Sequence, residues 1–231
     1  MKTYVIYNPS DHLSTNLVKD TVLGCESNGL SPILHAGTFG EDIEIKIKKY
    51  GIRPSRLCQD VNKGTTGCFL SHYELWLKCA SGVETFLILE HDVTMISPLP
   101  DNIEELFEDV LHLDFCGSKQ KDLDNYLKCI EQKNDLKILM PFNKKPSSLN
   151  TWKEAKKNNI PGGYAYLIKP KAAQKLIDAA GKHGFMPADV HINNYYIDLK
   201  AISPSIFRIC DFMLDRKNRI KFSSTKGYKN G

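Results

Sequence analysis

Three ionisable residues, Glu90, His91 and Asp92, directly follow the apolar run FLIL at residues 86–89. Such a run is typical of a buried strand, and a buried strand accepts charged side chains only where they have a partner or a function. In open α/β sheets, ligands bind beyond the carboxyl ends of strands. Glu90 and Asp92 would share one side of the strand if its geometry continued through them. We therefore expect both carboxylates to point into a site.

Two neighbouring carboxylates suggest a divalent cation. Hard oxygen ligands suit Mg²⁺ or Mn²⁺, which bind one or two protein carboxylates together with substrate phosphates. The sequence thus predicts a metal and a diphosphate at Glu90 and Asp92. The alternative is that the two residues only begin a polar turn before Pro98.

The elements that would position this site alternate along the chain. Apolar runs predict five strands, and apolar residues at helical spacing predict helices. The expected strands are 4–8, 31–36, 86–90, 113–117 and 163–169, and the expected helices are 13–25, 65–80, 102–111 and 170–181. The alternating IEIKIK at 43–48 is compatible with either element. This order predicts an α/β fold with a central, largely parallel sheet flanked by helices, in a single domain over 1–231.

The composition favours a cytoplasmic protein. The chain has seven cysteines, with neither a CxxC pair nor the dense, even spacing of a disulfide framework, so reduced and mostly buried thiols are expected. No signal-peptide pattern and no run of 18 apolar residues is present, so we expect neither secretion nor a membrane span.

The net charge of +4 is unevenly distributed. Residues 46–56 hold five basic and no acidic positions, residues 137–157 hold six lysines against Glu154, and residues 216–231 hold six basic and no acidic positions. The last is a C-terminal segment that could be flexible. The three segments could form a positive face toward an anionic acceptor, or they could be ordinary solvated lysines.

Four stretches, in order, resemble motifs of glycosyltransferase family 25. They are GCFLSHYELW (67–76), FLILEHDV (86–93), GGYAYLIKPKAAQKLI (162–177) and MPADV (186–190), and the resemblance covers roughly residues 60–205. It implies the nucleotide-sugar-binding fold called GT-A. It also implies an inverting transfer in which an acceptor hydroxyl displaces a nucleoside diphosphate from a sugar, with a UDP-sugar as the expected donor.

The resemblance assigns roles to the acidic residues. Glu90 and Asp92 match the family's acidic motif for the metal and the diphosphate, whereas His91, counted among the donor-binding residues, replaces a middle acid. Asp189 matches a Pro-x-Asp, and we expect it to be the general base that an inverting attack needs, with Asp211 in reserve. His191 is expected either to be a third metal ligand or to face solvent.

Two departures from the family pattern indicate a divergent member. Thr66 stands where the family usually has Glu, and SDHLSTN follows the first strand in place of an arginine-bearing segment.

Further donor-binding residues are expected at strand ends, at a glycine pair and on a helix. The glycines would allow close backbone approach to the sugar. The Ser-His pair matches the family motif and could equally be structural. These residues are Tyr7, Asn8, Ala36, Gly37, Gly162, Gly163, Ser71 and His72.

The acceptor is open between two anionic classes. The basic segments have aromatic neighbours and suit a phosphate backbone, which narrowly favours hydroxymethylated bases in viral DNA, modified in the host cytoplasm after base flipping. The alternative is a bacterial lipooligosaccharide or similar surface glycan, built at the inner face of the membrane. A third hypothesis, from another class, is a non-catalytic carbohydrate- or nucleotide-binding protein, which the intact acidic residues argue against.

Overall fold

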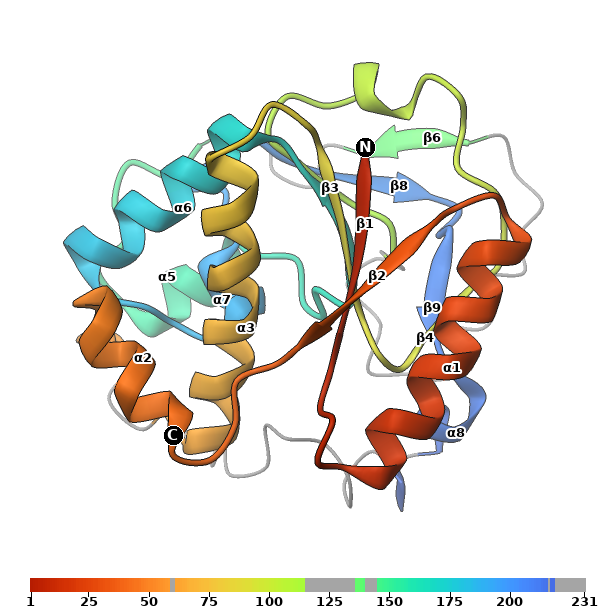
Figure 1. Ribbon diagram of the computed structural model, residues 1–231. Helices are drawn as coiled ribbons and strands as arrows, with labels where there is room; N and C mark the ends of the chain where they lie inside the picture. The colour runs from red at the N-terminus through yellow and green to blue at the C-terminus, as the bar shows by residue number, and fades with distance from the viewer. Residues whose placement is uncertain (59–60, 115–135, 140–144, 216, 219–231) are drawn as a thin grey trace.

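The central feature is a seven-stranded sheet with the strand order β2-β1-β3-β7-β5-β8-β6. The computed structural model describes residues 1–231 except 59–60, 115–135, 140–144, 216 and 219–231 (Figure 1). The strands of this sheet are β1 (Lys2–Tyr7), β2 (Pro32–Ala36), β3 (Phe86–Glu90), β5 (Val110–His112), β6 (Lys137–Leu139), β7 (Ala165–Ile168) and β8 (Leu199–Ser203).

Five of these seven strands run in the same direction. β6 and β7 are antiparallel to their neighbours, whereas β1, β2, β3, β5 and β8 share one direction. A separate antiparallel pair is formed by β4 (Val93–Met95) and β9 (Phe207–Ile209). The predicted largely parallel sheet is therefore confirmed.

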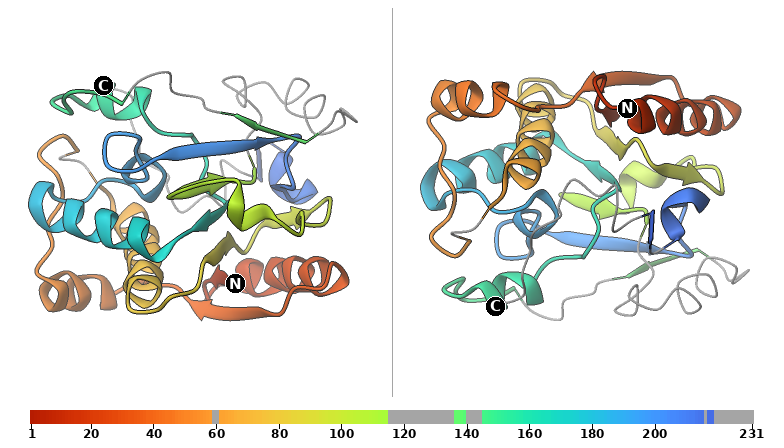
Figure 2. Two further views of the ribbon diagram at one scale, coloured as in Figure 1. Left: turned by 90° about the horizontal axis from the view of Figure 1, so that it is seen from above. Right: turned by 90° about the horizontal axis from the view of Figure 1, so that it is seen from below.

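Helices cover both faces of the sheet (Figures 1 and 2). α1 (His12–Ser27) and α8 (Asp211–Leu214) lie on one side. On the other side lie α2 (Asp42–Tyr50), α3 (Lys63–Ala80), α5 (Trp152–Lys157), α6 (Pro170–His183) and α7 (Ala188–His191). A short 3-10 helix, η1, spans Ile103–Glu105.

Strand β3 contributes to the two larger of the three hydrophobic clusters in the described residues. Because side chains alternate along a strand, Phe86 and Ile88 pack into the cluster that contains α3 and α6 residues. Leu87 and Leu89 pack into the opposite cluster, which contains α1 residues such as Val18. Glu90 has the same parity as Ile88 and therefore faces α3.

Three expected elements differ from the structure, and the stretch 43–48, which was compatible with a strand or a helix, is helical within α2, with Ile43 buried and Ile45 63% exposed. The strand expected over 113–117 is wrong for the described residues 113–114, because β5 spans Val110–His112, and residues 115–117 lie outside the described residues. The acidic helix expected over 102–111 is wrong, because only η1 is helical there and residues 110–112 form β5 between β7 and β8. Helix α6 continues past Gly181 to His183, and Gly184, at φ 79°, follows its end.

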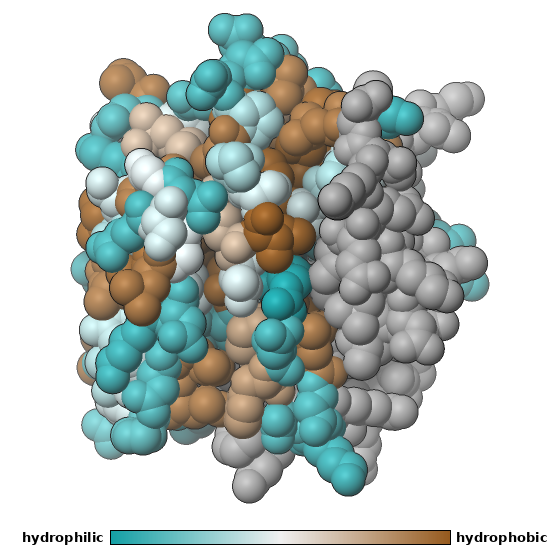
Figure 3. Space-filling view, turned by 90° about the vertical axis from the view of Figure 1, so that its right-hand side faces the viewer, coloured by the Kyte–Doolittle hydropathy of each residue, from teal (hydrophilic) through white to brown (hydrophobic). Residues whose placement is uncertain are grey.

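Five of the seven cysteines lie in the described residues, and each is a thiol outside any disulfide there. These are Cys25, Cys58, Cys68, Cys79 and Cys210, whereas Cys116 and Cys129 lie outside the described residues. Within the described part of the chain, no helix combines the length and the apolar character needed to cross a bilayer. On the face shown in Figure 3, hydrophobic and hydrophilic residues are interspersed.

Two helical glycines should respond oppositely to alanine. A Cβ at Gly67 in α3 would collide with the carbonyl oxygen of Thr38, whose amide is held by Ser71 Oγ at 2.9 Å. A Cβ at Gly181 in α6 would meet nothing within 4 Å. We predict that Gly67→Ala destabilises the protein by about 1–3 kcal/mol, whereas Gly181→Ala stabilises it by about 0.5–1 kcal/mol.

Urea unfolding followed by circular dichroism measures both changes. If Gly67→Ala raised the unfolding midpoint as Gly181→Ala is expected to do, the close approach of α3 to the Thr38 backbone would be wrong.

Candidate active site

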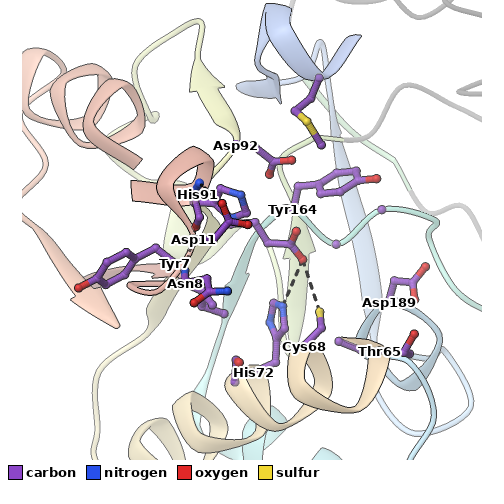
Figure 4. Close-up of a pocket in the computed structure, with 18 of the residues that line it drawn as sticks. Tyr7, Asn8, Asp11, Thr65, Cys68, His72, His91, Asp92, Tyr164 and Asp189 are labelled. Atoms are coloured by element: carbon purple, nitrogen blue, oxygen red, sulfur yellow. Dashed lines mark hydrogen bonds and ion pairs between the residues drawn. The ribbon is translucent and has the colours of Figure 1, made fainter. Parts of the chain in front are cut away.

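A cavity of about 540 Å³ opens at the carboxyl ends of β1 and β3 (Figure 4). Besides these strand ends, the residues before β7, one face of α3 and the start of α7 contribute to its walls. The polar lining residues are Tyr7, Asn8, Asp11, Ser14, Thr65, Cys68, Ser71, His72, Glu90, His91, Asp92, Tyr164 and Asp189, together with Gly162 and Gly163.

Glu90 ends β3 and points toward α3. Its amide donates to the Tyr164 carbonyl at 2.8 Å, which fixes the backbone where the strand stops. Its Oε1 lies 3.4 Å from His72 Nε2 and 3.9 Å from Cys68 Sγ, and Figure 4 draws both contacts as dashed lines. Cys68 and His72 are four residues apart and therefore share one face of α3.

Asp92 reaches the same cavity through a turn. The strand does not continue through His91 and Asp92, so the expected alternation is not what joins the carboxylates. The turn is held from both sides, because Thr21 Oγ1 of α1 lies 2.8 Å from the carbonyls of His91 and Val93. The Cys210 amide donates to the Asp92 carbonyl at 2.7 Å.

The acidic groups are poorly solvated. Burial raises the pKa of Glu90 to about 8, and the negative charge of nearby Asp92 adds to this shift. Burial also raises the pKa of Asp92, which the charge of His91 partly opposes. Asp92 Oδ1 is buried and has no hydrogen-bond partner among the described residues. A cation between the two carboxylates would satisfy this oxygen and offset the repulsion, so these residues fit a divalent metal.

Asp189 enters the cavity from the opposite wall, at the start of α7. Burial raises the pKa of Asp189, and the amides of Val190 and Gly162 oppose the shift. Gly163 packs against it, since a Cβ there would lie 3.5 Å from Asp189 Cβ. Gly162 and Gly163 have φ of 114° and 75°, a region that favours glycine and lets the backbone line the cavity.

The first strand supplies the remaining wall. Tyr7 and Asn8 both line the cavity. The Asn8 amide donates to Ser14 Oγ at 2.8 Å, which ties the strand end to α1. Asp11 caps α1 by accepting from the amides of Leu13 and Ser14. Sequence reasoning missed Asp11, although Asp before an apolar-periodic stretch is a helix-start pattern.

Three expected site residues do not line the cavity. His191 is fully buried, its Nε2 lies 3.0 Å from the Leu176 carbonyl, and its ring stacks on Trp76 with centroids 5.7 Å apart. This is the environment of a core histidine, neither a ligand position beside Glu90 nor a solvent-facing one. Ala36 and Gly37 end β2 outside the cavity.

The side chains of Ser71 and Asp211 have partners within the protein that account for them without a donor or a metal. Ser71 Oγ donates to the Gly67 carbonyl at 2.7 Å and accepts from Thr38, so the structural alternative accounts for its hydroxyl. Asp211 pairs with Arg208 and its side chain is 81% exposed, away from the cavity.

The comparisons identify the family. The model of glycosyltransferase family 25, described as "LPS biosynthesis protein", matches residues 34–192. The chain belongs to glycosyltransferase family 25. The match includes α3, the Glu90–Asp92 turn and Asp189, so the cavity described above lies largely within the family domain.

Curated relatives of this family member carry the label inactive. The rat "Probable inactive glycosyltransferase 25 family member 3" is 27% identical over 145 residues, which are 56% of this chain and 20% of the rat protein. The human "Inactive glycosyltransferase 25 family member 3" is 43% identical over 51 residues, 22% of this chain and 9% of the human one. The matched region therefore spans about a fifth or less of these relatives.

A solved structure, mouse xyloside xylosyltransferase 1 in its apo form, aligns with a TM-score of 0.37 at 7% identity. The alignment covers 84% of this chain and 80% of the mouse chain. Similarity at this level supports neither a residue role nor a substrate.

The raised pKa of Glu90 predicts a pH-dependent stability in the metal-free protein. The pKa of Glu90 is about 8 in the folded protein, above its ordinary value of 4.5. Between these values the folded state holds more protons, so the free energy of unfolding falls as pH rises, by at most about 1.4 kcal/mol per pH unit. Glu90→Gln should remove this contribution and stabilise the protein most near pH 8.

Urea unfolding in the presence of a chelator, at several pH values from 5 to 8 (roughly the interval of the shift), measures the two slopes. Parallel curves for wild type and Glu90→Gln would show that the Glu90 carboxyl is not perturbed.

Proposed function

We propose that this protein transfers a sugar from a nucleoside diphosphate sugar to an acceptor hydroxyl. The observation that supports this most is that Glu90, Asp92 and Asp189, from two separate family motifs, line one cavity in a chain of glycosyltransferase family 25. The cavity volume of about 540 Å³ is in the range of small-molecule sites.

Glu90 and Asp92 would hold Mn²⁺ or Mg²⁺, which supplies positive charge to the donor diphosphate when it is bound. The paired, desolvated carboxylates and the unpartnered Asp92 Oδ1 support this assignment. His91, between them, would contribute to donor contacts in place of an acid.

Asp189 would act as the general base of an inverting transfer. As the acceptor oxygen bonds to the anomeric carbon and the bond to the diphosphate breaks, the acceptor proton passes to the Asp189 carboxylate. The raised pKa of Asp189 suits this role, because a carboxylate with a higher pKa accepts a proton more readily.

The donor would lie between the first strand and the glycine pair. Tyr7 and Asn8 offer polar contacts on one wall, and Gly162 and Gly163 let the sugar approach the backbone on the other. We propose a UDP-sugar as the donor. His72, which already contacts Glu90, would orient that carboxylate.

The acceptor proposal rests on a second groove of about 480 Å³ that shares no lining residue with the first cavity. Arg53, Arg56 and Lys182 line it, and none of them pairs with a carboxylate in the described part of the chain. Residues 147–150 form another wall with uncharged side chains, so the basic lining residues come from the 46–56 segment and from Lys182.

Backbone hydrogen bonds fix the chain that carries Arg53. The Ser55 amide donates to the Phe185 carbonyl at 2.7 Å, and the Phe185 amide donates to the Arg53 carbonyl at 2.8 Å. Two arginines that line one groove are suited to a phosphate group.

We propose a phosphate-bearing surface glycan as the acceptor. The family's description as an LPS biosynthesis protein and the local extent of the groove favour it. Hydroxymethylated DNA stays a hypothesis that needs an extended basic face. The third basic segment, 216–231, lies almost wholly outside the described residues, so its convergence with the other two stays a prediction.

The second candidate function is a non-catalytic carbohydrate- or nucleotide-binding protein. The word inactive in the names of the curated relatives favours it. Donor binding without turnover or hydrolysis, under conditions that include Mn²⁺, would support this candidate over transfer.

Two substitutions should separate binding from chemistry. Asp92→Asn should lose metal-dependent binding of UDP, because it replaces an anionic ligand. Asp189→Asn should bind UDP and metal like wild type yet lose about 10²- to 10⁴-fold in turnover. Calorimetry and a product assay measure the two effects, with thermal unfolding as a check on folding. Asp92→Asn with wild-type binding and turnover would refute the metal assignment, and unchanged turnover in Asp189→Asn would refute the base.

Arginine substitutions test the acceptor. Arg53→Ala with Arg56→Ala should raise the acceptor KM about tenfold or more without changing donor affinity. Lys48→Ala with Lys49→Ala, in the same basic segment but outside the groove, is the matched control. Truncated lipooligosaccharide and hydroxymethylcytosine DNA are offered with a panel of nucleotide sugars, and mass spectrometry detects the added sugar. Transfer to the DNA alone would overturn the glycan proposal.

A further inference from the structure

Three side chains with different donor atoms converge beneath the cavity. Cys68 and His72 project from one face of α3, and Glu90 meets them from the end of β3. Glu90 Oε1 lies 3.9 Å from Cys68 Sγ and 3.4 Å from His72 Nε2, and the three ligand atoms all lie within 4.8 Å of one another. No hydrophobic packing requires a thiol, an imidazole and a carboxylate at such distances.

We propose that Cys68, His72 and Glu90 form a zinc site. Zinc binds thiolate sulfur at about 2.3 Å and imidazole nitrogen or carboxylate oxygen at about 2.0–2.2 Å. Around a tetrahedral ion these lengths separate neighbouring ligand atoms by roughly 3.3–3.7 Å. The two distances to Glu90 are within a few tenths of an ångström of that range. The ligand atoms of Cys68 and His72, which lie within 4.8 Å of each other, would approach by up to about 1 Å when the ion binds.

The choice of zinc follows from the donor atoms. Mg²⁺ and Ca²⁺ prefer oxygen ligands, whereas a mixed sulfur, nitrogen and oxygen set suits zinc. The Cys68 thiol loses its proton to solvent when the ion binds, because the thiolate is the ligand form. This set shares Glu90 with the Glu90–Asp92 pair, but its other two ligands are a thiol and an imidazole from α3 instead of a second carboxylate.

His72 is oriented by a buried hydrogen-bonded chain. Its Nδ1 lies 2.8 Å from the hydroxyl of Tyr166, and that oxygen accepts from Trp76 Nε1 at 2.9 Å. With the imidazole proton on Nδ1, the Nε2 lone pair faces Cys68 and Glu90. A hydrogen bond at the far ring nitrogen is the usual support of a metal-binding histidine.

The site has an open side. All three residues line the cavity, so a ligand or water could take a fourth position on the metal. Because Glu90 belongs to both ligand sets, zinc at this site would withdraw it from Mn²⁺ or Mg²⁺. Zinc should therefore inhibit metal-dependent donor binding, a consequence that rests on the proposed function, whereas zinc binding itself does not.

Zinc binding is measured on the full chain after chelator treatment, by competition with a chromogenic chelator. We expect one high-affinity zinc ion that is weakened at least tenfold by Cys68→Ala and by His72→Gln. Cys25→Ala is the matched control, since Cys25 is a buried helical cysteine of α1 outside the cavity. Co²⁺ in place of zinc should give a near-ultraviolet thiolate charge-transfer band that Cys68→Ala alone removes.

Asp92→Asn distinguishes the two proposals. It should keep zinc affinity while losing Mn²⁺-dependent binding of UDP. Zinc affinity unchanged by Cys68→Ala, or a cobalt band that survives it, would overturn the zinc site even if UDP binding stood. Zinc bound through Cys68 in a protein that never binds UDP would support the zinc site and remove the proposed function.

Discussion

The structure of the site depends on keeping two carboxylates close together in a poorly solvated place. Asp92 is buried and Glu90 is partly buried near the end of β3, and the charge of Asp92 disfavours ionisation of Glu90. A fold maintains such a pair only where the backbone leaves no alternative. Here the Glu90 amide is tied to Tyr164, and the Asp92 carbonyl is tied to Cys210. A bound proton or a bound cation would therefore reduce the repulsion between the two carboxylates.

Local sequence patterns correctly predicted the elements whose buried residues follow the pattern. The stripe of apolar residues in α3 and the apolar run of β3 pack in the two clusters that the alternation of β3 implies. The pattern failed at residues 110–112, where acidic neighbours favoured a helix. Asp109 instead bonds to Lys175 and to the Asp198 amide, and β5 is completed by pairing with β7 and β8. Long-range pairing of this kind has no local sequence pattern.

The same limit applies to the site residues. Asp189 and His191 are two positions apart in a four-residue helix, and one lines the cavity while the other is buried against Trp76. Because residues two apart on a helix face different directions, a motif that contains both cannot give them one role. Cys68 was predictable in principle, since it precedes His72 by one helical turn. That Cys68 belongs to a site becomes visible only in the fold, which places Glu90 opposite Cys68 and His72.

The two hydrophobic clusters each hold one part of the cavity. On the α3 side, the bonds from Trp76 through Tyr166 to His72 connect the packed interior with Glu90. On the α1 side, Thr21 holds the turn that carries Asp92. The separation of the carboxylates is thus set by a two-residue turn between the clusters on the two faces of the sheet. A small shift of either cluster would change the distance between the carboxylates and therefore how they can share a cation. Packing in the core thus affects the chemistry of the site.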